Sequence, residues 1–162
     1  MVGYMNLEVR VDKDFSLAHR KALRGRMGAP MRREATSNRL LCFDDLRKVP
    51  GAMGRIYRSQ RTVPRAEIGG SVGRCSEFDG DVMPARASVE ERWKRIDRAF
   101  HRGEELAPVS LYKVGGIYFV LDVHHRASVA CYHGIEWIDA YVTEFGAGGS
   151  GVWSTGRDRE SA

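Results

Sequence analysis

Near the start of the chain, two patterns of apolar residues overlap. Residues 4–13 alternate between apolar and polar positions, as a half-buried strand does, whereas a longer apolar stripe repeats at helical spacing. The stripe consists of Leu7, Val11, Phe15, Ala18 and Ala22. We expect a helix over residues 14–27 that ends at nearby glycines and Pro30. A second, shorter helix is expected to begin at Asp44 or Asp45, because carboxylates suit the first turn of a helix.

A second helical stripe lies in the middle of the chain, with apolar residues at spacings of four, three and four. The stripe consists of Val89, Trp93, Ile96 and Phe100. Ser88 and Glu91 have the spacing of a capping box, in which each side chain bonds a backbone N–H group at the helix start. We therefore expect a helix that begins at Ser88 and is closed off by Gly103.

The last part of the chain alternates strand and turn signals. Apolar runs at 109–114 and 117–121 are separated by two glycines, which predicts a β-hairpin with a two-residue turn. A short helix at 126–133, ended by Gly134, and a final strand at 137–145 follow. An earlier segment, 69–74, holds three glycines in five residues before a cation, a composition that lets a backbone approach a ligand closely or simply forms a turn.

Composition adds a charge asymmetry to this picture. The chain has 162 residues, 43% of them apolar and 29% charged, which suits one globular domain with an appendage. Residues 1–60 carry 13 Lys and Arg against 6 Asp and Glu, or +7, whereas residues 61–145 carry 11 against 13, or −2. Any binding to a nucleic acid is therefore expected to depend on the N-terminal third; the alternative is a solvated basic face.

Other features exclude several classes of protein. No apolar stretch approaches the roughly 18 residues of a membrane span, and the N-terminus lacks the pattern of a secretory signal, so we expect a cytoplasmic protein with no membrane partner. Cys42, Cys75 and Cys131 are odd in number and widely spaced, which indicates neither a disulfide framework nor a thiolate zinc site. We expect buried or idle thiols.

The candidate binding and catalytic residues lie in the stretch that joins the second hairpin strand to the helix that follows. In this stretch an apolar run is followed by Asp122, His124, His125 and Arg126, and then by small residues. A helix that opens after such a polar corner directs unpaired N–H groups and its positive dipole end at the corner. The planar guanidinium of Arg126 adds several N–H donors, so the expected ligand is an anion, and a phosphate fits this geometry best. The alternative for Arg126 is a surface ion pair.

The side chains at this corner each have two interpretations. His124 and His125 have ordinary pKa values near neutrality, about 6.5, which suits general acid or base catalysis, but a hydrogen-bonded structural histidine is the commoner case. Asp122 can orient an imidazole, although capping the following helix is the favoured role. A metal triad of Asp122 and the two histidines is disfavoured because adjacent side chains at a strand end diverge. We assign no metal ligand.

Two segments, taken in their order along the chain, resemble the ParB/sulfiredoxin superfamily. Within it, they resemble the ParB-like nuclease domain family and in particular its small actinobacterial members, which are bacterial proteins. The segments are Gly70-Ser71-Val72-Gly73-Arg74 and Asp122-x-His124-His125-Arg126-x-Ser128-Val129-Ala130. The resemblance covers about half of the chain. It implies a compact α+β domain, a small mixed sheet with packed helices, at residues 61–145. A basic helical extension at 1–60 precedes this domain, and a tail at 146–162, rich in glycine and charge, is expected to be disordered.

The resemblance also implies a ligand and a set of residues that hold it. Members of the superfamily bind CTP or ATP, some cleave DNA, and some phosphorylate free serine, so a nucleotide with Mg is the cofactor that the resemblance implies. The residues placed at the phosphates are Gly73, Arg74, Asp122, His124, His125, Arg126 and Ser128, with His124 and His125 as the catalytic candidates.

The chain departs from the family patterns at three positions. His124 replaces the nucleophilic cysteine of sulfiredoxins and an acidic residue of the partition proteins, in which an arginine stands at the position of His125, so both of those chemistries are disfavoured. Val123 stands where the best-matching pattern has glycine. Either the loop adopts an extended conformation there, or a positive φ strains the valine and ligand affinity has fallen.

Three functions follow as hypotheses. The first is a regulatory or DNA-associated domain that binds the phosphates of a nucleotide or nucleic acid. The second is an enzyme, either a ParB-like nuclease or a nucleotide-dependent small-molecule kinase. The third is a scaffold whose ligand site has decayed. The sequence carries no information on the oligomeric state.

Overall fold

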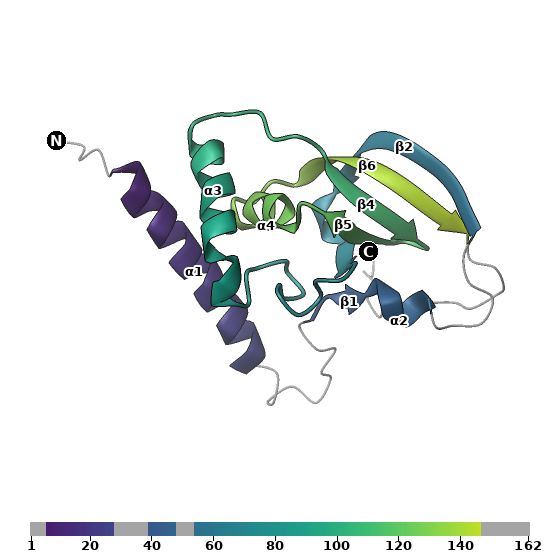
Figure 1. Ribbon diagram of the computed structural model, residues 1–162, viewed down its shortest axis with the longest axis horizontal. Coiled ribbons are helices and arrows are strands. Elements are labelled where there is room, and N and C mark those ends of the chain that lie inside the picture. Colours follow the sequence, from purple (N-terminus) through teal and green to yellow (C-terminus); the bar gives the residue numbers. More distant parts are fainter. Residues whose placement is uncertain (1–5, 28–38, 48–53, 147–162) are drawn as a thin grey trace, which may run out of the picture.

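The protein has a mixed α+β architecture, seen in a computed structural model that describes residues 6–27, 39–47 and 54–146 (Figure 1). The helices are α1 (Leu7–Met27), α2 (Phe43–Arg47), α3 (Glu90–His101) and α4 (His124–Tyr132). The strands are β1 (Leu41–Cys42), β2 (Gly54–Pro64), β3 (Ile68–Ser71), β4 (Val109–Val114), β5 (Ile117–Asp122) and β6 (Trp137–Gly146). The expected α+β class, with a mixed sheet, is confirmed.

The strands form one six-stranded sheet in the order β1-β3-β5-β4-β6-β2. The neighbours β1, β3 and β5 run parallel, β4 is antiparallel to β5, and β6 runs parallel to β4 and antiparallel to β2. Three adjacent parallel strands therefore end at the same edge of the sheet. In open sheets this is the edge at which ligands bind, in crevices beyond the carboxyl ends of the strands.

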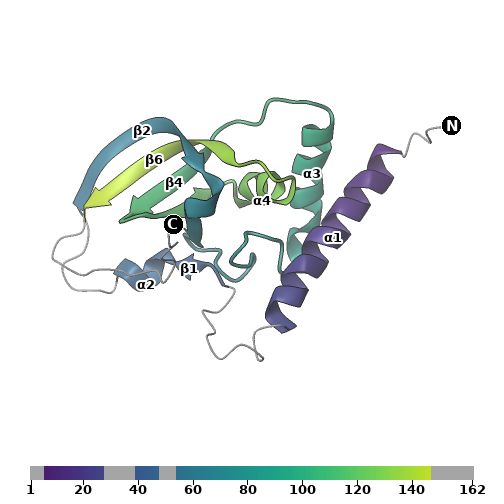
Figure 2. The same ribbon diagram turned by 180° about the vertical axis from the view of Figure 1, so that it is seen from behind.

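The longer helices stack beside the sheet in layers. Figures 1 and 2 show α4 between the sheet and α3, with α1 on the outer side of α3. Trp93 of α3 holds these helices together: it is fully buried, its ring contacts Phe15 of α1 and Tyr132 of α4 edge-on, and its indole Nε1 donates to Ser128 Oγ at 2.9 Å. The helical stripe around Trp93 therefore packs inward, as its spacing predicts.

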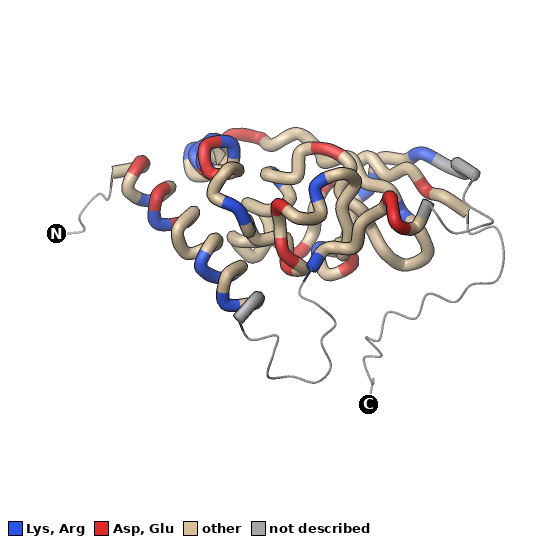
Figure 3. Tube along the Cα trace, turned by 60° about the horizontal axis from the view of Figure 1, so that its bottom comes forward, with Lys and Arg blue, Asp and Glu red and all other residues tan. Residues whose placement is uncertain are grey.

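Ion pairs join the first half of α1 to α3. Arg98 donates from two nitrogens to the carboxylate of Glu8, at 2.7 and 2.8 Å, and Lys94 Nζ lies 2.8 Å from Asp12 Oδ1. Basic residues follow in the second half of α1, as Figure 3 shows, where they suit the negative end of the helix dipole. Those with exposed side chains are Arg20, Lys21 and Arg24.

The first helix begins earlier than expected, at Leu7 rather than at residue 14. Of the two overlapping patterns, the helical one is realised because Val11 is already fully buried in the stripe that faces α3. The short helix expected at Asp44 or Asp45 is confirmed as α2. The predicted helix break at Pro30 and the predicted tail beyond Gly146 lie outside the described residues.

The expected domain boundary between residues 60 and 61 is wrong. Strand β2 begins at Gly54 and pairs with β6 from Gly54 opposite Gly146 to Pro64 opposite Trp137, so the boundary falls inside a strand. The residues around the boundary are mostly polar and lack the alternation of a half-buried strand. Backbone pairing with β6, rather than a local signal, places them in the sheet.

The capping box predicted at the start of the middle helix is also wrong. Residues Ala87–Val89 form a 3-10 turn, α3 begins at Glu90, and no side chain caps either element. The 3-10 turn moves the helix start two residues along the chain, which leaves Ser88 exposed on the turn. The predicted end is close: α3 stops at His101, and Gly103 follows with a φ of +68°.

The hairpin and the last strand form where expected. Strands β4 and β5 have the predicted limits to within one residue, with Gly115 at a φ of +60° in the turn between them. Strand β6 spans Trp137–Gly146. Among the described residues, no helix combines the length and the apolar character needed to span a bilayer.

Candidate anion-binding site

The Gly-rich segment and the polar corner lie side by side. Strands β3 and β5 pair in parallel, with Ser71 opposite Val120, and the Val72 N–H group donates to the Val120 carbonyl at 2.8 Å just beyond the strand end. The loop after β3 and the start of α4 after β5 therefore meet at the same edge of the sheet. This brings together the two segments that the sequence singled out, whose linking residues Ser71 and His124 stand 53 positions apart along the chain.

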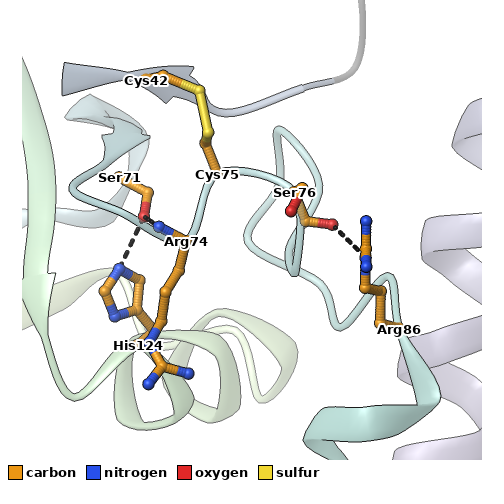
Figure 4. Close-up of a disulfide and its surroundings, with 7 residues drawn as sticks. All are labelled: Cys42, Ser71, Arg74, Cys75, Ser76, Arg86 and His124. Atoms are coloured by element: carbon orange, nitrogen blue, oxygen red, sulfur yellow. Dashed lines mark hydrogen bonds between the residues drawn. A yellow bond between two sulfur atoms is a disulfide. The ribbon is translucent and has the colours of Figure 1, made fainter. Parts of the chain in front are cut away.

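Ser71 and His124 link the two segments (Figure 4). The Ser71 hydroxyl lies 2.7 Å from His124 Nε2 and accepts a hydrogen bond from the Arg74 N–H group at 3.3 Å. Ser71 is fully buried and His124 is 3% exposed. Burial, followed by the charge of Arg74, lowers the pKa of His124 to about 4, so its imidazole is neutral at pH 7. In this position His124 holds the Gly-rich loop against α4.

The residue between strand and helix, Val123, has φ +53° and ψ +41°. This is the left-handed region, which a β-branched side chain rarely enters. The alternative that the loop is extended here is therefore wrong, and the backbone has the conformation that a glycine adopts without strain.

At the N-terminus of α4, no side chain of the described residues forms a capping hydrogen bond. The first backbone bond of this helix joins the Arg126 N–H group to the Val123 carbonyl at 2.9 Å. The expected capping by Asp122 is wrong: Asp122 is exposed, and the cap position is taken by Val123. The N–H groups at the start of a helix lack partners within it, so this end can receive an acceptor from outside.

His125 lies in positive surroundings. Burial lowers its pKa first, and the charges of Arg74 and Arg92 lower it further, against an opposing effect of Glu77. The ring meets Phe78 edge-on, and within the described part of the chain its buried Nε2 atom has no hydrogen-bond partner. The two arginines that act on His125 place positive charge near the start of α4, which is the sign that an anion requires.

The two arginines assigned to the anion already have protein partners. Arg74 Nη1 donates to Glu77 Oε2 at 2.9 Å, and Arg126 Nη1 donates to the Ala107 carbonyl, just before β4, at 3.1 Å. The Arg126 Nε atom is buried and has no hydrogen-bond partner among the residues that the structure describes. Figure 4 shows the Arg74 side chain beside His124. That Arg74 and Arg126 converge on one phosphate stays a prediction.

Two residues of the family-like segments have internal roles. Ser128 is fully buried and accepts the Trp93 indole hydrogen bond, which keeps its hydroxyl away from the surface. Gly70 lies in β3 opposite Phe119, and a Cβ atom there would stand 2.1 Å from the Phe119 ring. The close approach that Gly70 permits is therefore to an aromatic ring of the same sheet. Gly73, in contrast, is exposed in the loop, with a φ of +77°.

A disulfide joins Cys42 to Cys75, so the expectation of unpaired thiols is wrong for both. The bond ties the end of β1 to the residue that follows Arg74 (Figure 4). Cys131 is a free buried thiol, and burial raises its pKa to about 12. Structural disulfides persist mainly in oxidising compartments. The cytoplasmic location expected from the sequence stays a prediction, and this bond does not support it.

A cavity of about 250 Å³ lies away from this corner. Lys21, Arg65 and Asp81 supply its charged lining, and the Cys131 thiol borders it. Arg65 Nη1 is bonded to the Cys131 carbonyl at 3.0 Å, which places that guanidinium in the wall. The cavity shares no residue with the Arg74 and His124 corner.

Sequence reasoning missed Arg92 and the disulfide. Arg92 precedes Trp93 on α3, and it acts on His125 only because α3 packs against α4. An apolar helical stripe that contains a buried tryptophan does indicate that the residues beside the tryptophan lie near a partner element, but it does not identify that element. No spacing along the chain indicates the approach of Cys42 to Cys75.

Comparison with known proteins produced no relative: no protein-family model matches the chain, and no curated protein or solved structure gave a significant match. The resemblance to the ParB/sulfiredoxin superfamily therefore depends on the two sequence segments alone.

Backbone strain at Val123 has a measurable consequence. We expect Val123→Gly to be more stable than Val123→Ala by about 1 kcal/mol, because alanine keeps the left-handed penalty and glycine removes it. Both changes delete the partly buried valine side chain, so their difference isolates the backbone. Urea unfolding of the two variants measures it. An alanine variant as stable as the glycine variant would contradict strain at this position.

Proposed function

We propose that this protein is a phosphate-binding domain of the ParB-like kind, which binds a nucleotide or nucleic acid where β3 and β5 end. The observation that carries the proposal is the uncapped N-terminus of α4 beside the Arg74 loop. Backbone N–H groups, the helix dipole and guanidinium groups are what phosphate sites use.

The role proposed for the domain is binding without catalysis. His124, the first catalytic candidate, is almost wholly buried and bonded to Ser71. A general acid or base has to reach the proton that it transfers, within about 3 Å or through one water. The second candidate, His125, has its Nε2 atom buried. In this arrangement the His124 imidazole is closed to a substrate, and His125 is closed at Nε2.

The Glu77 carboxylate competes with a bound anion for the Arg74 guanidinium. It holds the Arg74 guanidinium at 2.9 Å, and the side chains of Arg74 and Glu77 are 39% and 29% exposed, so the pair can exchange for a phosphate without unfolding the loop. Exposed ion pairs of this kind contribute little to stability. Removing the Glu77 charge should therefore free Arg74 for the ligand.

The test is a titration of the wild-type chain with CTP, ATP and a short DNA duplex, with and without Mg²⁺, at about 0.1 M salt. Arg74→Ala and Arg126→Ala are expected to weaken binding of the preferred ligand by about 10- to 100-fold each, since a hydrogen bond to a charged group contributes about 1.5–3 kcal/mol. Glu77→Gln is expected to strengthen it.

Arg102→Ala is the matched control, because Arg102 is an exposed arginine just after α3 whose nearest carboxylate, that of Glu104, lies 3.8 Å away. It should bind like the wild type. Failure of all three ligands to bind wild type would favour the decayed-scaffold alternative, and undiminished binding by Arg74→Ala would place the ligand elsewhere. Plasmid cleavage or ATP turnover that disappears in His124→Ala would favour the enzyme alternative.

A further inference from the structure

Four metal-ligating side chains meet on the other side of the helical layer, far along α4 from the anion corner. Asp14 comes from α1, Asp97 and His101 from α3, and His133 directly follows α4. One ligand atom from each residue lies within 4.8 Å of the other three. Three helical segments that are distant in the sequence therefore direct two imidazoles and two carboxylates at one point.

The contacts within this cluster are short. His133 Nε2 lies 2.6 Å from Asp97 Oδ1, and His101 Nε2 lies 2.7 Å from Asp14 Oδ2. The remaining contact, between His101 Nε2 and Asp97 Oδ2, is 3.4 Å. Both histidines face the cluster with Nε2, one of the two ring nitrogens through which a neutral imidazole can bind a metal.

Asp97 is the observation that points to a ligand. Its side chain is 0% exposed, and among the described residues its Oδ2 atom makes no hydrogen bond and has only the 3.4 Å contact with His101 Nε2. A buried carboxylate oxygen that has lost its water without gaining a hydrogen bond is unfavourable. A cation at the centre would satisfy the oxygen and offset the repulsion between the carboxylates.

We propose that Asp14, Asp97, His101 and His133 bind a divalent transition-metal ion of the zinc type. Zinc bonds of about 2.0–2.2 Å place tetrahedral ligand atoms roughly 3.3–3.6 Å apart. The ligand atoms of the cluster span this range, from 2.6 Å to no more than 4.8 Å, so rotation of side chains suffices to close the shell. Two imidazoles select such an ion over Mg²⁺ or Ca²⁺, which prefer oxygen ligands.

The neighbours of the cluster orient its ligands. The Tyr132 hydroxyl donates to Asp14 Oδ1 at 3.1 Å, which leaves Oδ2 directed at the histidines. Phe100 stacks on the His133 ring with the ring centres 4.1 Å apart. Such outer contacts fix the rotamers of metal ligands and exclude water from the ion.

Four protein ligands leave no open position for a substrate, so the ion is structural. It would fasten α1, the first element of the described chain, to α3 and to the end of α4. The proposal is independent of the anion site, which uses other residues.

The experiment uses the full chain without a polyhistidine tag, dialysed against a chelator and then titrated with zinc in competition with a metal-binding dye. We expect one zinc ion per chain, a rise in melting temperature with zinc, and no rise with Mg²⁺. Cobalt(II) in place of zinc should give the visible absorption of a tetrahedral site. This measurement on the wild type needs no variant to fold.

Asp14→Asn and His133→Ala should each weaken zinc binding by more than about 100-fold, which exceeds the loss typical of outer contacts. Asp12→Asn is the matched control on the same helix, since Asp12 pairs with Lys94 outside the cluster. It should bind zinc like the wild type. No retained zinc, no tetrahedral cobalt spectrum, or equal affinity in Asp14→Asn and Asp12→Asn would each overturn the proposal.

Discussion

Reduction of the Cys42–Cys75 disulfide is expected to lower the free energy of unfolding by about 3–4 kcal/mol. The bond closes a loop between residues 33 apart, and a loop of this length restricts the unfolded chain by about that amount in the chain-entropy model. Domains of this size have total stabilities of about 5–15 kcal/mol, so the expected effect is a large part of the whole. Urea unfolding with and without a phosphine reductant measures it.

The matched control is the double variant Cys42→Ser/Cys75→Ser. Its stability should equal that of the reduced wild type and should not respond to the reductant. Thiol titration of the unfolded wild type should rise from one free thiol to three on reduction. If the titration rises and the stability does not fall, the disulfide is not a stabilising element.

The same bond bears on the anion site, because Cys75 directly follows Arg74. Loss of the bond frees the outer end of the loop, while Ser71 and His124 continue to hold its inner end. Reduced protein should therefore keep its fold at moderate temperature and bind a phosphate ligand less tightly than oxidised protein.

The second large effect is expected for Gly70→Ala, which should lower the free energy of unfolding by about 3 kcal/mol. The new Cβ atom would lie 2.1–2.9 Å from three atoms of the Phe119 ring. Phe119 is fully buried and meets Phe43 of α2 edge-on, so the ring has no free space to enter. Over-packing of this kind costs about 1–3 kcal/mol and more where backbone has to move.

Gly116→Ala is the control for this prediction. Gly116 has open space around its Cα and no positive φ, so the substitution should be neutral or slightly stabilising. Thermal unfolding of the two variants beside wild type gives the comparison. A Gly70→Ala protein as stable as Gly116→Ala would mean that Phe119 has another accessible rotamer.

The elements that could be predicted from sequence are those with a local cause. The β4–β5 hairpin and β6 follow from apolar runs and a glycine turn, and α3 follows from the spacing around Trp93. Strand β2 could not be predicted, because its middle, residues 58–62, is wholly polar and only pairing with β6 makes it a strand. Local propensity is overridden there by a long-range hydrogen-bond ladder.

The candidate site divides in the same way. The polar corner between β5 and α4 is visible as a motif, and its proximity to Arg74 required only that two strands be parallel neighbours. The fully buried Asp97 was not predictable, because a carboxylate in mid-helix is usually solvated. Its burial depends on α1 and on His133, which approach it only in the folded chain.

The position of β2 at one end of the sheet has a consequence for behaviour in concentrated solution. Within the described residues, β2 pairs with β6 alone, so its other side presents a row of backbone donors and acceptors to which a strand from a second molecule could add. Arg58 on this strand is exposed, and Pro64, which lacks an N–H group, ends it. Charged side chains on an edge strand and a proline at its end both disfavour pairing with a foreign strand, and this opposes aggregation through the edge.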